Sequence, residues 1–264
     1  MAGDPVLCPH CSGDMVYTRH AGRMFDAYLG NALHVLRDLP PGSVDMVLTD
    51  PPYGTGANGV AGRLRSTTAK YTSRTTSLLP DFHGDSVMPD IWQRLIFSVY
   101  KKCFRLLKPG GYALVFSDWR AVSQMISLLG VSGFSLSTVC VWDKGRRSRP
   151  TKNGFRAQSE LIVCAKKSGV MHRDTPVYLD GVFRCNAVPG ASRVHLVEKP
   201  VELLSQLIEA CPPGGTVLDP FHGSGSTGVA ALKSGRRYIG AESVEHYHHV
   251  AVERLSAMEQ EIAA

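Results

Sequence analysis

Short apolar runs alternate with amphipathic stretches along most of this chain. Residues 44–48 form a short apolar run bounded by turn residues, which is typical of a strand buried in a parallel sheet. In residues 90–107 the apolar side chains recur at helical spacing and gather on one face, which predicts an amphipathic helix. The same patterns predict other strands at residues 25–29, 112–116, 135–142, 158–165, 217–218 and 236–239, and other helices at residues 32–39, 119–129, 201–211, 228–233 and 244–262.

Strands and helices that take turns along a chain indicate an α/β fold, in which helices cover a sheet. A chain of 264 residues can form one large domain with a substantial core, and we expect residues 25–264 to do so. We expect residues 1–24 to be a loose N-terminal extension. This extension contains Cys8 and Cys11 in a C-x-x-C arrangement, but no second such pair completes a structural zinc site. We therefore expect no metal, with a zinc site as the alternative.

The charge balance is mildly basic, with a formal net charge of +6 and a pI of about 9.0. This charge suits a polyanionic partner, but many proteins are basic for solubility alone. Residues 1–10 lack the apolar core of a secretory signal and the seven cysteines are scattered, so we expect a reducing, cytoplasmic setting without disulfides. No apolar run approaches the length that spans a bilayer, so no membrane association is expected.

The run at residues 44–48 leads into the sequence V-L-T-D-P-P-Y-G-T-G at residues 47–56. Two prolines stop the strand, and they leave the Asp50 carboxylate, the Pro51 carbonyl and the Tyr53 ring at its carboxyl end. Ligands of open α/β sheets bind at that end. Asp50 and Pro51 could accept hydrogen bonds from the exocyclic amino group of a base, and Tyr53 could stack on the base.

At these residues the sequence resembles the amino-directed DNA methyltransferases, which carry a D-P-P-Y motif. For four residues alone, the alternative is a strand and a Pro-Pro turn without chemistry. A second motif far downstream decides between these interpretations.

The second motif is G-T-V-L-D-P-F-H-G-S-G-S-T-G at residues 215–228. A short strand ends at Asp219, a glycine-rich turn follows, and a helix begins after it. Glycines let the backbone approach a ligand closely, and Glu242 follows the next strand, where a βαβ unit puts a carboxylate on ribose hydroxyls. Without a Walker lysine, a phosphate-loop ATPase is not expected. A nicotinamide site is the competitor, but such a site has no Asp-Pro before the glycine-rich loop, where this chain has Asp219 and Pro220.

The form Asp219-Pro-Phe-x-Gly-x-Gly resembles the S-adenosylmethionine site of methyltransferases. The D-P-P-Y motif comes first and the glycine motif second, an order similar to that of the beta class of amino methyltransferases, whose motifs are circularly permuted. The resemblance runs from about residue 27 to residue 254. It implies a Rossmann-like S-adenosylmethionine-dependent methyltransferase fold, with a mixed seven-stranded sheet and helices on both faces.

The resemblance also implies a set of cofactor-binding residues. Asn31 stands where the family usually has an acid that helps to bind the cofactor's adenine, and it could equally serve as a helix N-cap. Lys199 lies in a His-x-x-x-Lys-Pro stretch like the one that packs beside the cofactor in the family. The full set is Asn31, Asp50, Lys199, Asp219, Pro220, Phe221, Gly223, Ser224, Gly225, Thr227 and Glu242.

The implied activity is site-specific methylation of the N6 amine of adenine in duplex DNA, with the base flipped out of the helix. Asp50, Pro51, Pro52 and Tyr53 are the implied catalytic residues, and no metal is needed. Cytosine N4 methylation is the nearest alternative, although family members acting there more often begin the motif with Ser. Methylation of protein glutamine or of RNA is disfavoured, because those relatives usually have Asn-Pro-Pro-Tyr and the opposite motif order. A non-catalytic DNA-binding regulator with this fold is an alternative of another class.

Three stretches are candidates for DNA contact. Residues 54–86 are rich in Gly, Ser and Thr and carry cations, which predicts a basic lid beside the catalytic motif. Residues 144–152 form a basic segment between two predicted strands, where phosphate contact competes with a merely solvated hairpin. Residues from about 166 to 193 fall where the family has its target-recognition region. The candidate DNA-binding residues are Arg63, Arg65, Lys70, Arg74, Lys144, Arg146, Arg147, Arg149, Lys152 and Arg173.

The target-recognition region is short, so recognition would need the loop at residues 54–86 or a second subunit. We therefore expect a homodimer acting on double-stranded DNA. The resemblance further implies a bacterial or phage-encoded protein of DNA restriction and modification.

Overall fold

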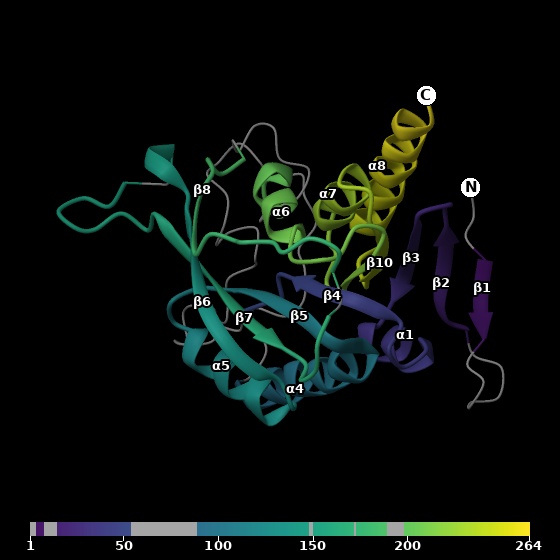
Figure 1. Cartoon of the computed structure of the whole chain (residues 1–264), viewed down its shortest axis with the longest axis horizontal. Helices are drawn as coiled ribbons and strands as arrows, with labels where there is room; N and C mark the ends of the chain where they lie inside the picture. The colour runs from purple at the N-terminus through teal and green to yellow at the C-terminus, as the bar shows by residue number, and fades with distance from the viewer. Residues whose placement is uncertain (1–3, 8–14, 54–88, 148–149, 172, 189–197) are drawn as a thin grey trace.

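The computed structural model describes residues 4–7, 15–53, 89–147, 150–171, 173–188 and 198–264. Within them, ten strands form one mixed sheet in the order β1-β2-β3-β10-β9-β4-β5-β7-β6-β8 (Figure 1). The strands are β1 (Asp4–Leu7), β2 (Met15–Ala21), β3 (Phe25–Gly30), β4 (Val44–Thr49), β5 (Leu107–Ser117), β6 (Ser135–Asp143), β7 (Ser159–Lys166), β8 (Val182–Arg184), β9 (Thr216–Asp219) and β10 (Arg237–Glu242). The helices are α1 (Ala32–Asp38), α4 (Pro89–Leu106), α5 (Val122–Val131), α6 (Val201–Ile208), α7 (Ser226–Lys233) and α8 (Glu245–Ala263), with a 3₁₀ turn η2 (Gly145–Arg147). None of these helices is both long enough and apolar enough to cross a membrane.

The inner part of the sheet, from β3 to β6, holds the seven strands that the sequence predicts, so the fold class is confirmed. β3, β10, β9, β4 and β5 run parallel, while β7 is antiparallel to both of its neighbours. Three strands extend the sheet beyond the predicted count: β1 and β2 at one edge, and β8 at the other.

The N-terminal segment is part of the sheet rather than the loose extension that we expected. β2 pairs antiparallel with β3, with Thr18 opposite Leu29, and β1 pairs with β2. β2 thus gives hydrogen-bond partners to the backbone groups of β3 that would otherwise lie at the edge of the sheet. Residues 15–21 mix polar and apolar residues without a clear run, which is why the apolar pattern missed them. Cys8 and Cys11 lie outside the described residues.

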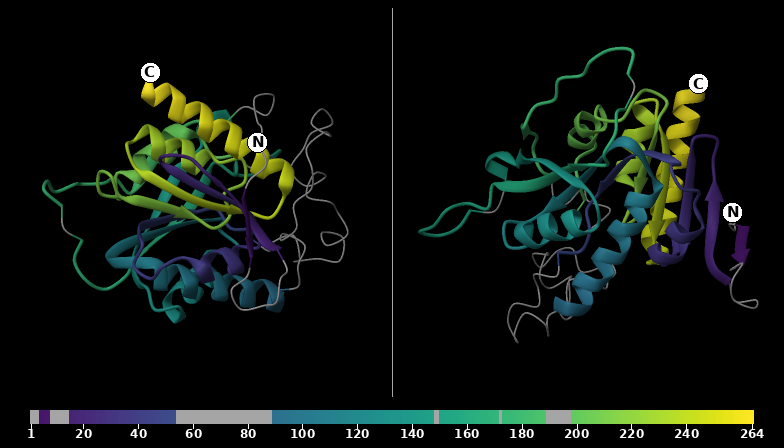
Figure 2. Two further views of the ribbon diagram at one scale, coloured as in Figure 1. Left: turned by 90° about the vertical axis from the view of Figure 1, so that its right-hand side faces the viewer. Right: turned by 60° about the horizontal axis from the view of Figure 1, so that its bottom comes forward.

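β4 is buried on both faces, because each face packs against its own layer of helices. Met46 and Leu48 belong to the core under α6, α7 and α8, whereas Val44 and Val47 belong to the core over α1, α4 and α5. The two layers lie above and below the sheet in Figure 1, and Figure 2 shows them from two other directions. Each fully buried Val or Leu contributes roughly 1.5–3 kcal/mol. The strand that leads to Asp50 is therefore held at the centre of the molecule.

β4 pairs with β5 on one side and with β9 on the other. In the β4–β9 pair, Met46 lies opposite Val217 and Val47 lies opposite Leu218. Because the strands are parallel, their carboxyl ends meet at the same edge of the sheet. The two sequence motifs therefore begin side by side.

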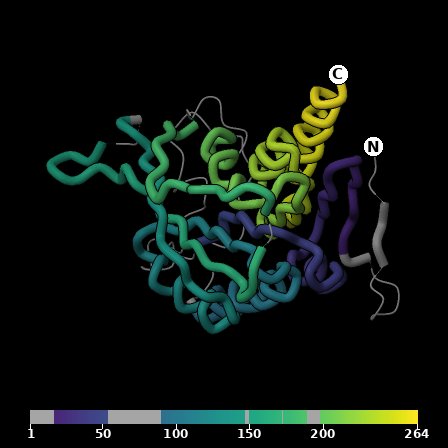
Figure 3. The backbone as a smooth tube through the Cα atoms, viewed as in Figure 1, coloured from purple at the N-terminus to yellow at the C-terminus, as the bar shows by residue number. Residues whose placement is uncertain are grey.

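The connection between β6 and β7 projects away from the body of the molecule (Figures 1 and 3). Asn153 adopts the left-handed backbone conformation, with φ of 54°, and the Gly154 N–H donates to the Thr151 carbonyl. Phe155, which follows this turn, is fully exposed. The described residues of this connection, 144–147 and 150–158, thus form a protruding hairpin with an aromatic side chain near its tip.

Candidate active site

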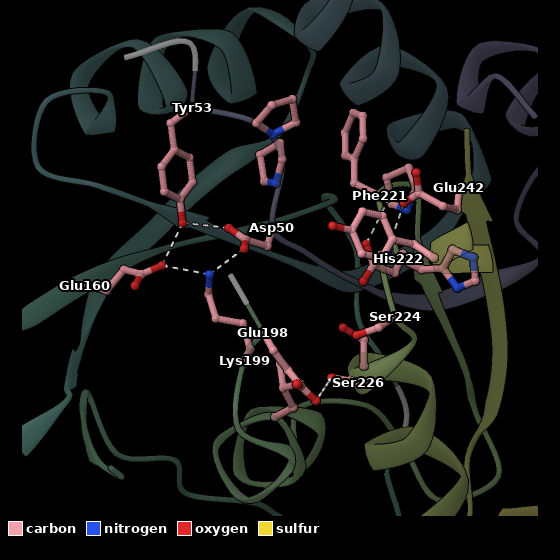
Figure 4. A pocket seen from close by; sticks show the side chains of 18 of the residues that line it. Asp50, Tyr53, Glu160, Glu198, Lys199, Phe221, His222, Ser224, Ser226 and Glu242 are labelled. Atoms are coloured by element: carbon pink, nitrogen blue, oxygen red, sulfur yellow. Dashed lines mark hydrogen bonds and ion pairs between the residues drawn. The ribbon is translucent and has the colours of Figure 1, made fainter. Parts of the chain in front are cut away.

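The two motifs line one cavity of about 620 Å³ at the carboxyl ends of β4 and β9. Figure 4 shows two groups of side chains in its wall, one around Asp50 and the other around Phe221 and Glu242. All predicted cofactor residues except Gly225 line this cavity, and so do the four residues of the catalytic motif.

Two donors hold the Asp50 carboxylate. The Tyr53 hydroxyl lies 2.6 Å from Asp50 Oδ1, and the Lys199 ammonium donates to Asp50 Oδ2. Both donors also reach Glu160 Oε1, which lies 2.7 Å from Tyr53 Oη and 3.0 Å from Lys199 Nζ. The ends of β4 and β7 and the segment before α6 therefore converge on one buried polar cluster.

The charges in this cluster favour an ionised Glu160 and a cationic Lys199. Burial would lower the pKa of the Lys199 ammonium, but the Asp50 and Glu160 charges outweigh it and raise that pKa. Burial would likewise raise the pKa of Glu160, but Lys199 and Lys144 hold it below its usual range. For Asp50 burial prevails, and its pKa lies above the usual range despite the Lys199 charge.

A helix of the other layer fixes the turn between Asp50 and Tyr53. The Trp92 indole N–H of α4 donates to the Pro52 carbonyl at 2.6 Å, and the Trp92 ring is buried in the core. Pro51 is buried as well. The turn is thus anchored by stiff backbone and by a core side chain.

A direct hydrogen bond joins the two motifs. The Thr49 hydroxyl, one residue before Asp50, donates to Asp219 Oδ1 at 2.7 Å. The Phe221 N–H also donates to this oxygen, at 3.1 Å. Asp219 is only 3% exposed, and burial raises its pKa to about 7 although these hydrogen bonds oppose the shift.

The glycine turn approaches α8 too closely for larger residues. Gly225 has φ of 80°, and a Cβ atom there would lie 2.9 Å from the Ala251 Cβ of α8. Arg254 of α8 donates to the Ser224 carbonyl at 2.8 Å and pairs with Glu198 at 3.0 Å. α8 therefore forms the back wall of the turn, which makes glycine a structural requirement at residue 225.

Glu242 is the last residue of β10 and organises the other end of the cavity. Its carboxylate accepts hydrogen bonds from the N–H groups of Gly223 at 3.0 Å, Ser243 at 2.9 Å and Val244 at 2.8 Å. Burial nevertheless raises the pKa of Glu242. Asn31 also lines the cavity, and its side chain caps α1 by accepting from the Leu33 N–H at 2.9 Å, so the predicted N-cap is present.

The predicted DNA-binding residues divide into three groups. Arg146 and Lys152 are exposed on the hairpin, and Lys144 lies at the cavity wall, 3.5 Å from Glu160. Arg173 instead donates to the Glu209 and Ala210 carbonyls after α6, so its guanidinium is already engaged. Outside the described residues or side chains lie Arg63, Arg65, Lys70, Arg74, Arg147 and Arg149, together with the predicted lid.

Sequence reasoning gave no role to several side chains that the structure brings to the cavity. Glu160 lies within a predicted strand, and its contacts with Tyr53 and Lys199 join distant parts of the chain. Trp119 is 77% exposed at the cavity wall, where only its place after a strand could have marked it. His222 is 4% exposed with no hydrogen-bond partner for its ring among the described residues, and burial lowers its pKa to about 3.

Comparisons with known proteins show which family this chain resembles. The family model for N6/N4 DNA methylases matches residues 44–253. Protein YubD of Escherichia coli strain K12, named as a methylase, is 33% identical over 232 residues, covering 88% of this chain and 90% of YubD. The type II methyltransferase M.HinfI of Haemophilus influenzae is 25% identical over 247 residues, covering 86% of this chain and 67% of M.HinfI. TTHA0409 of Thermus thermophilus, named as a DNA modification methylase and solved with S-adenosyl-L-methionine, superposes with a TM-score of 0.64 at 22% identity, covering 90% of this chain and 94% of TTHA0409.

The raised pKa of Asp219 predicts a pH-dependent cost to stability. From about pH 4 to about pH 7 the folded protein keeps a proton on Asp219 that the unfolded chain has lost, so the contribution of this group to stability falls as the pH rises. Asp219→Asn removes this dependence, and we expect it to gain on the order of 2–4 kcal/mol relative to wild type between pH 5 and pH 8.

Urea unfolding of both proteins, followed by circular dichroism at each pH, measures this difference. Asp180→Asn, the same replacement at an exposed position, is the matched control. A difference between Asp219→Asn and wild type that does not change with pH would contradict the prediction.

Proposed function

The chain belongs to the N6/N4 DNA methylase family, and we propose that it transfers a methyl group from S-adenosylmethionine to the N6 amine of adenine in duplex DNA. The observation that carries this proposal is the shared cavity, in which Asp50 and Asp219 lie at neighbouring strand ends linked through Thr49. A group held at the glycine turn and a base held at Asp50 would therefore face each other.

The residues of the cavity fit this cofactor. Glu198, Asp219 and Glu242 surround the glycine turn, and no lysine follows its second glycine, so the turn suits a cationic ligand with hydroxyls better than a phosphate. Glu242 would accept from ribose hydroxyls, Asp219 would face the amino acid part, and Phe221 would pack on the cofactor. When bound, S-adenosylmethionine supplies a sulfonium methyl group whose carbon–sulfur bond breaks with both electrons staying on sulfur.

The protein's own contribution is to position the nucleophile. The exocyclic amine is a weak nucleophile because its lone pair is delocalised into the ring, and it must sit about 3–3.5 Å from the methyl carbon. Asp50 and the Pro51 carbonyl would accept its two N–H bonds, and Tyr53 would stack on the flipped base. The buried β4 and the Trp92 contact would keep these acceptors in place.

Adenine is preferred over cytosine because the motif begins with Asp50 rather than Ser. The family model spans N6 and N4 enzymes alike, so cytosine N4 stays the second candidate. Homodimer formation stays a prediction from the short target-recognition region, which sedimentation of the protein with and without a DNA duplex would measure.

Asp50→Ala should strongly lower the rate of methyl transfer, while the cofactor should still bind through the glycine turn and Glu242. Loss of the acceptor for the amine should lower the rate by roughly 10²–10⁴-fold. Tritiated methyl incorporation into DNA measures transfer, and calorimetry measures cofactor affinity. Asp180→Ala is the control at an exposed position, and full activity of Asp50→Ala would refute the catalytic assignment.

The methylated product identifies the base. DNA methylated by the protein in vitro should yield N6-methyladenine when it is digested to nucleosides and separated by chromatography. N4-methylcytosine as the only modified nucleoside would establish the second candidate, and no modified nucleoside would favour a non-catalytic regulator.

Replacing the exposed cations of the hairpin should weaken DNA binding. The double variant Arg146→Ala/Lys152→Ala is expected to bind any duplex less tightly, and its salt slope should fall by about 0.9 for each phosphate that it no longer neutralises. Fluorescence anisotropy of a labelled duplex over a salt series measures both quantities. Lys233→Ala/Arg237→Ala, which removes two exposed cations at the end of α7 and the start of β10, is the control, and equal weakening in the two double variants would argue against the hairpin.

A further inference from the structure

Glu160 lies outside both motifs, yet it meets both donors that hold Asp50. The Tyr53 hydroxyl donates to Asp50 Oδ1, and the Lys199 ammonium donates to Asp50 Oδ2. Tyr53 Oη and Lys199 Nζ also lie 2.7 Å and 3.0 Å from Glu160 Oε1. Figure 4 shows these four side chains pointing toward one another. One carboxylate oxygen of Glu160 is therefore a second acceptor for each donor on Asp50.

This arrangement bears on how a substrate amine can reach Asp50. An incoming N–H donor competes with Tyr53 and Lys199 for the Asp50 oxygens. Displacing a buried ammonium that had no other acceptor would leave an unpaired buried charge, which is strongly unfavourable. The side chains of Lys199 and Glu160 are only 10% and 12% exposed, so water offers little compensation.

We propose that Glu160 is a positioning residue that takes over the Tyr53 hydroxyl and the Lys199 ammonium when the target amine binds Asp50. The proposal rests on the proposed function, because that function supplies the incoming amine. Both donors keep a charged acceptor during the exchange, so Asp50 becomes available without an unpaired group.

The charges around Glu160 suit this role. Lys144 Nζ lies 3.5 Å from Glu160 Oε2, so two cations flank this carboxylate, whereas among the described residues Asp50 pairs with Lys199 alone. Glu160 therefore stays ionised at a pH where Asp50 begins to take up a proton, as the opposite directions of their pKa shifts indicate. The nitrogen that gains a methyl group gives up one N–H proton, which Asp50 can receive while Glu160 retains the ammonium.

Glu160→Gln tests the exchange, because it keeps the shape of the side chain and removes its charge. In this variant Lys199 keeps its ion pair with Asp50 and loses the one with Glu160. The electrostatic repulsion between the Asp50 and Glu160 carboxylates is also removed. In the cofactor-free protein, we expect the Asp50 carboxyl to titrate at lower pH than in wild type. Carbon NMR of labelled Asp side chains, assigned with Asp50→Asn, measures this, while the other groups near Asp50, namely Tyr53, Tyr100 and Asp219, are the same in both proteins.

Single-turnover methylation of DNA over a pH series gives the second readout. Glu160→Gln should lower the plateau rate by roughly tenfold or more, since each 1.4 kcal/mol costs a factor of ten. The acid limb of the pH–rate profile should also move to lower pH in this variant, because Asp50 stays ionised to a lower pH than in wild type. In the Lys199→Met background, Glu160→Gln should lower the single-turnover rate by a smaller factor than it does in wild type, because the ammonium that needs the second acceptor is gone.

Glu209→Gln is the matched control, since Glu209 is half exposed, pairs with Arg236 at 3.6 Å and is not among the residues that line the cavity. An unchanged Asp50 titration, or wild-type rates with an unchanged acid limb, would overturn the proposal. Equal rate reductions from Glu160→Gln in wild type and in the Lys199→Met background would also overturn the proposal.

If Glu160→Gln fails to fold, Glu160→Asp keeps the charge but withdraws the carboxylate oxygen from both donors, and full methyl transfer by that variant would refute the role of Glu160. Failure of wild type to methylate DNA would instead refute the proposed function, and the NMR titration would still report on Glu160.

Discussion

The pairing of β4 with β9 is the constraint on which the site depends. It brings two segments that are far apart in the sequence to one edge of the sheet, and the Thr49–Asp219 hydrogen bond fixes their spacing. Burial of β4 on both faces prevents the strand from shifting without disrupting the core packing on both sides. The other residues of the cavity wall, which include Glu242 and Lys199, are arranged around this pair of strand ends.

Much of this arrangement could be predicted from local sequence. An apolar run before Asp-Pro-Pro-Tyr requires a buried strand that ends in a stiff turn, and an apolar run before a glycine turn requires a strand that leads into a helix. Each of the seven inner strands is a short segment with a readable pattern, and Asn31 follows the simple rule for a helix N-cap. Such features depend on residues that are neighbours along the chain.

What could not be predicted depends on contacts between distant residues. The sequence places Lys199 before a helix, but only the fold brings its ammonium to Asp50 and Glu160 rather than beside the glycine turn. The sequence predicts that Arg173 contacts DNA, whereas in the structure its guanidinium donates to carbonyl groups after α6. β1 and β2 join the sheet because β3 offers an open edge, which no periodicity within residues 1–24 records.

The close approach of Gly225 to Ala251 gives the last helix a part in shaping the ligand cavity. Every motif residue precedes α8, so a chain shortened after β10 would keep all of the recognisable chemistry. Such a chain would lack the α8 surface that packs against the glycine turn at Gly225, and it would lack the hydrogen bond from Arg254 to the Ser224 carbonyl. The C-terminal helix therefore sets the conformation of the backbone that faces the ligand. A substitution on its inner side must fit the shape of the glycine turn as well as the packing of the core.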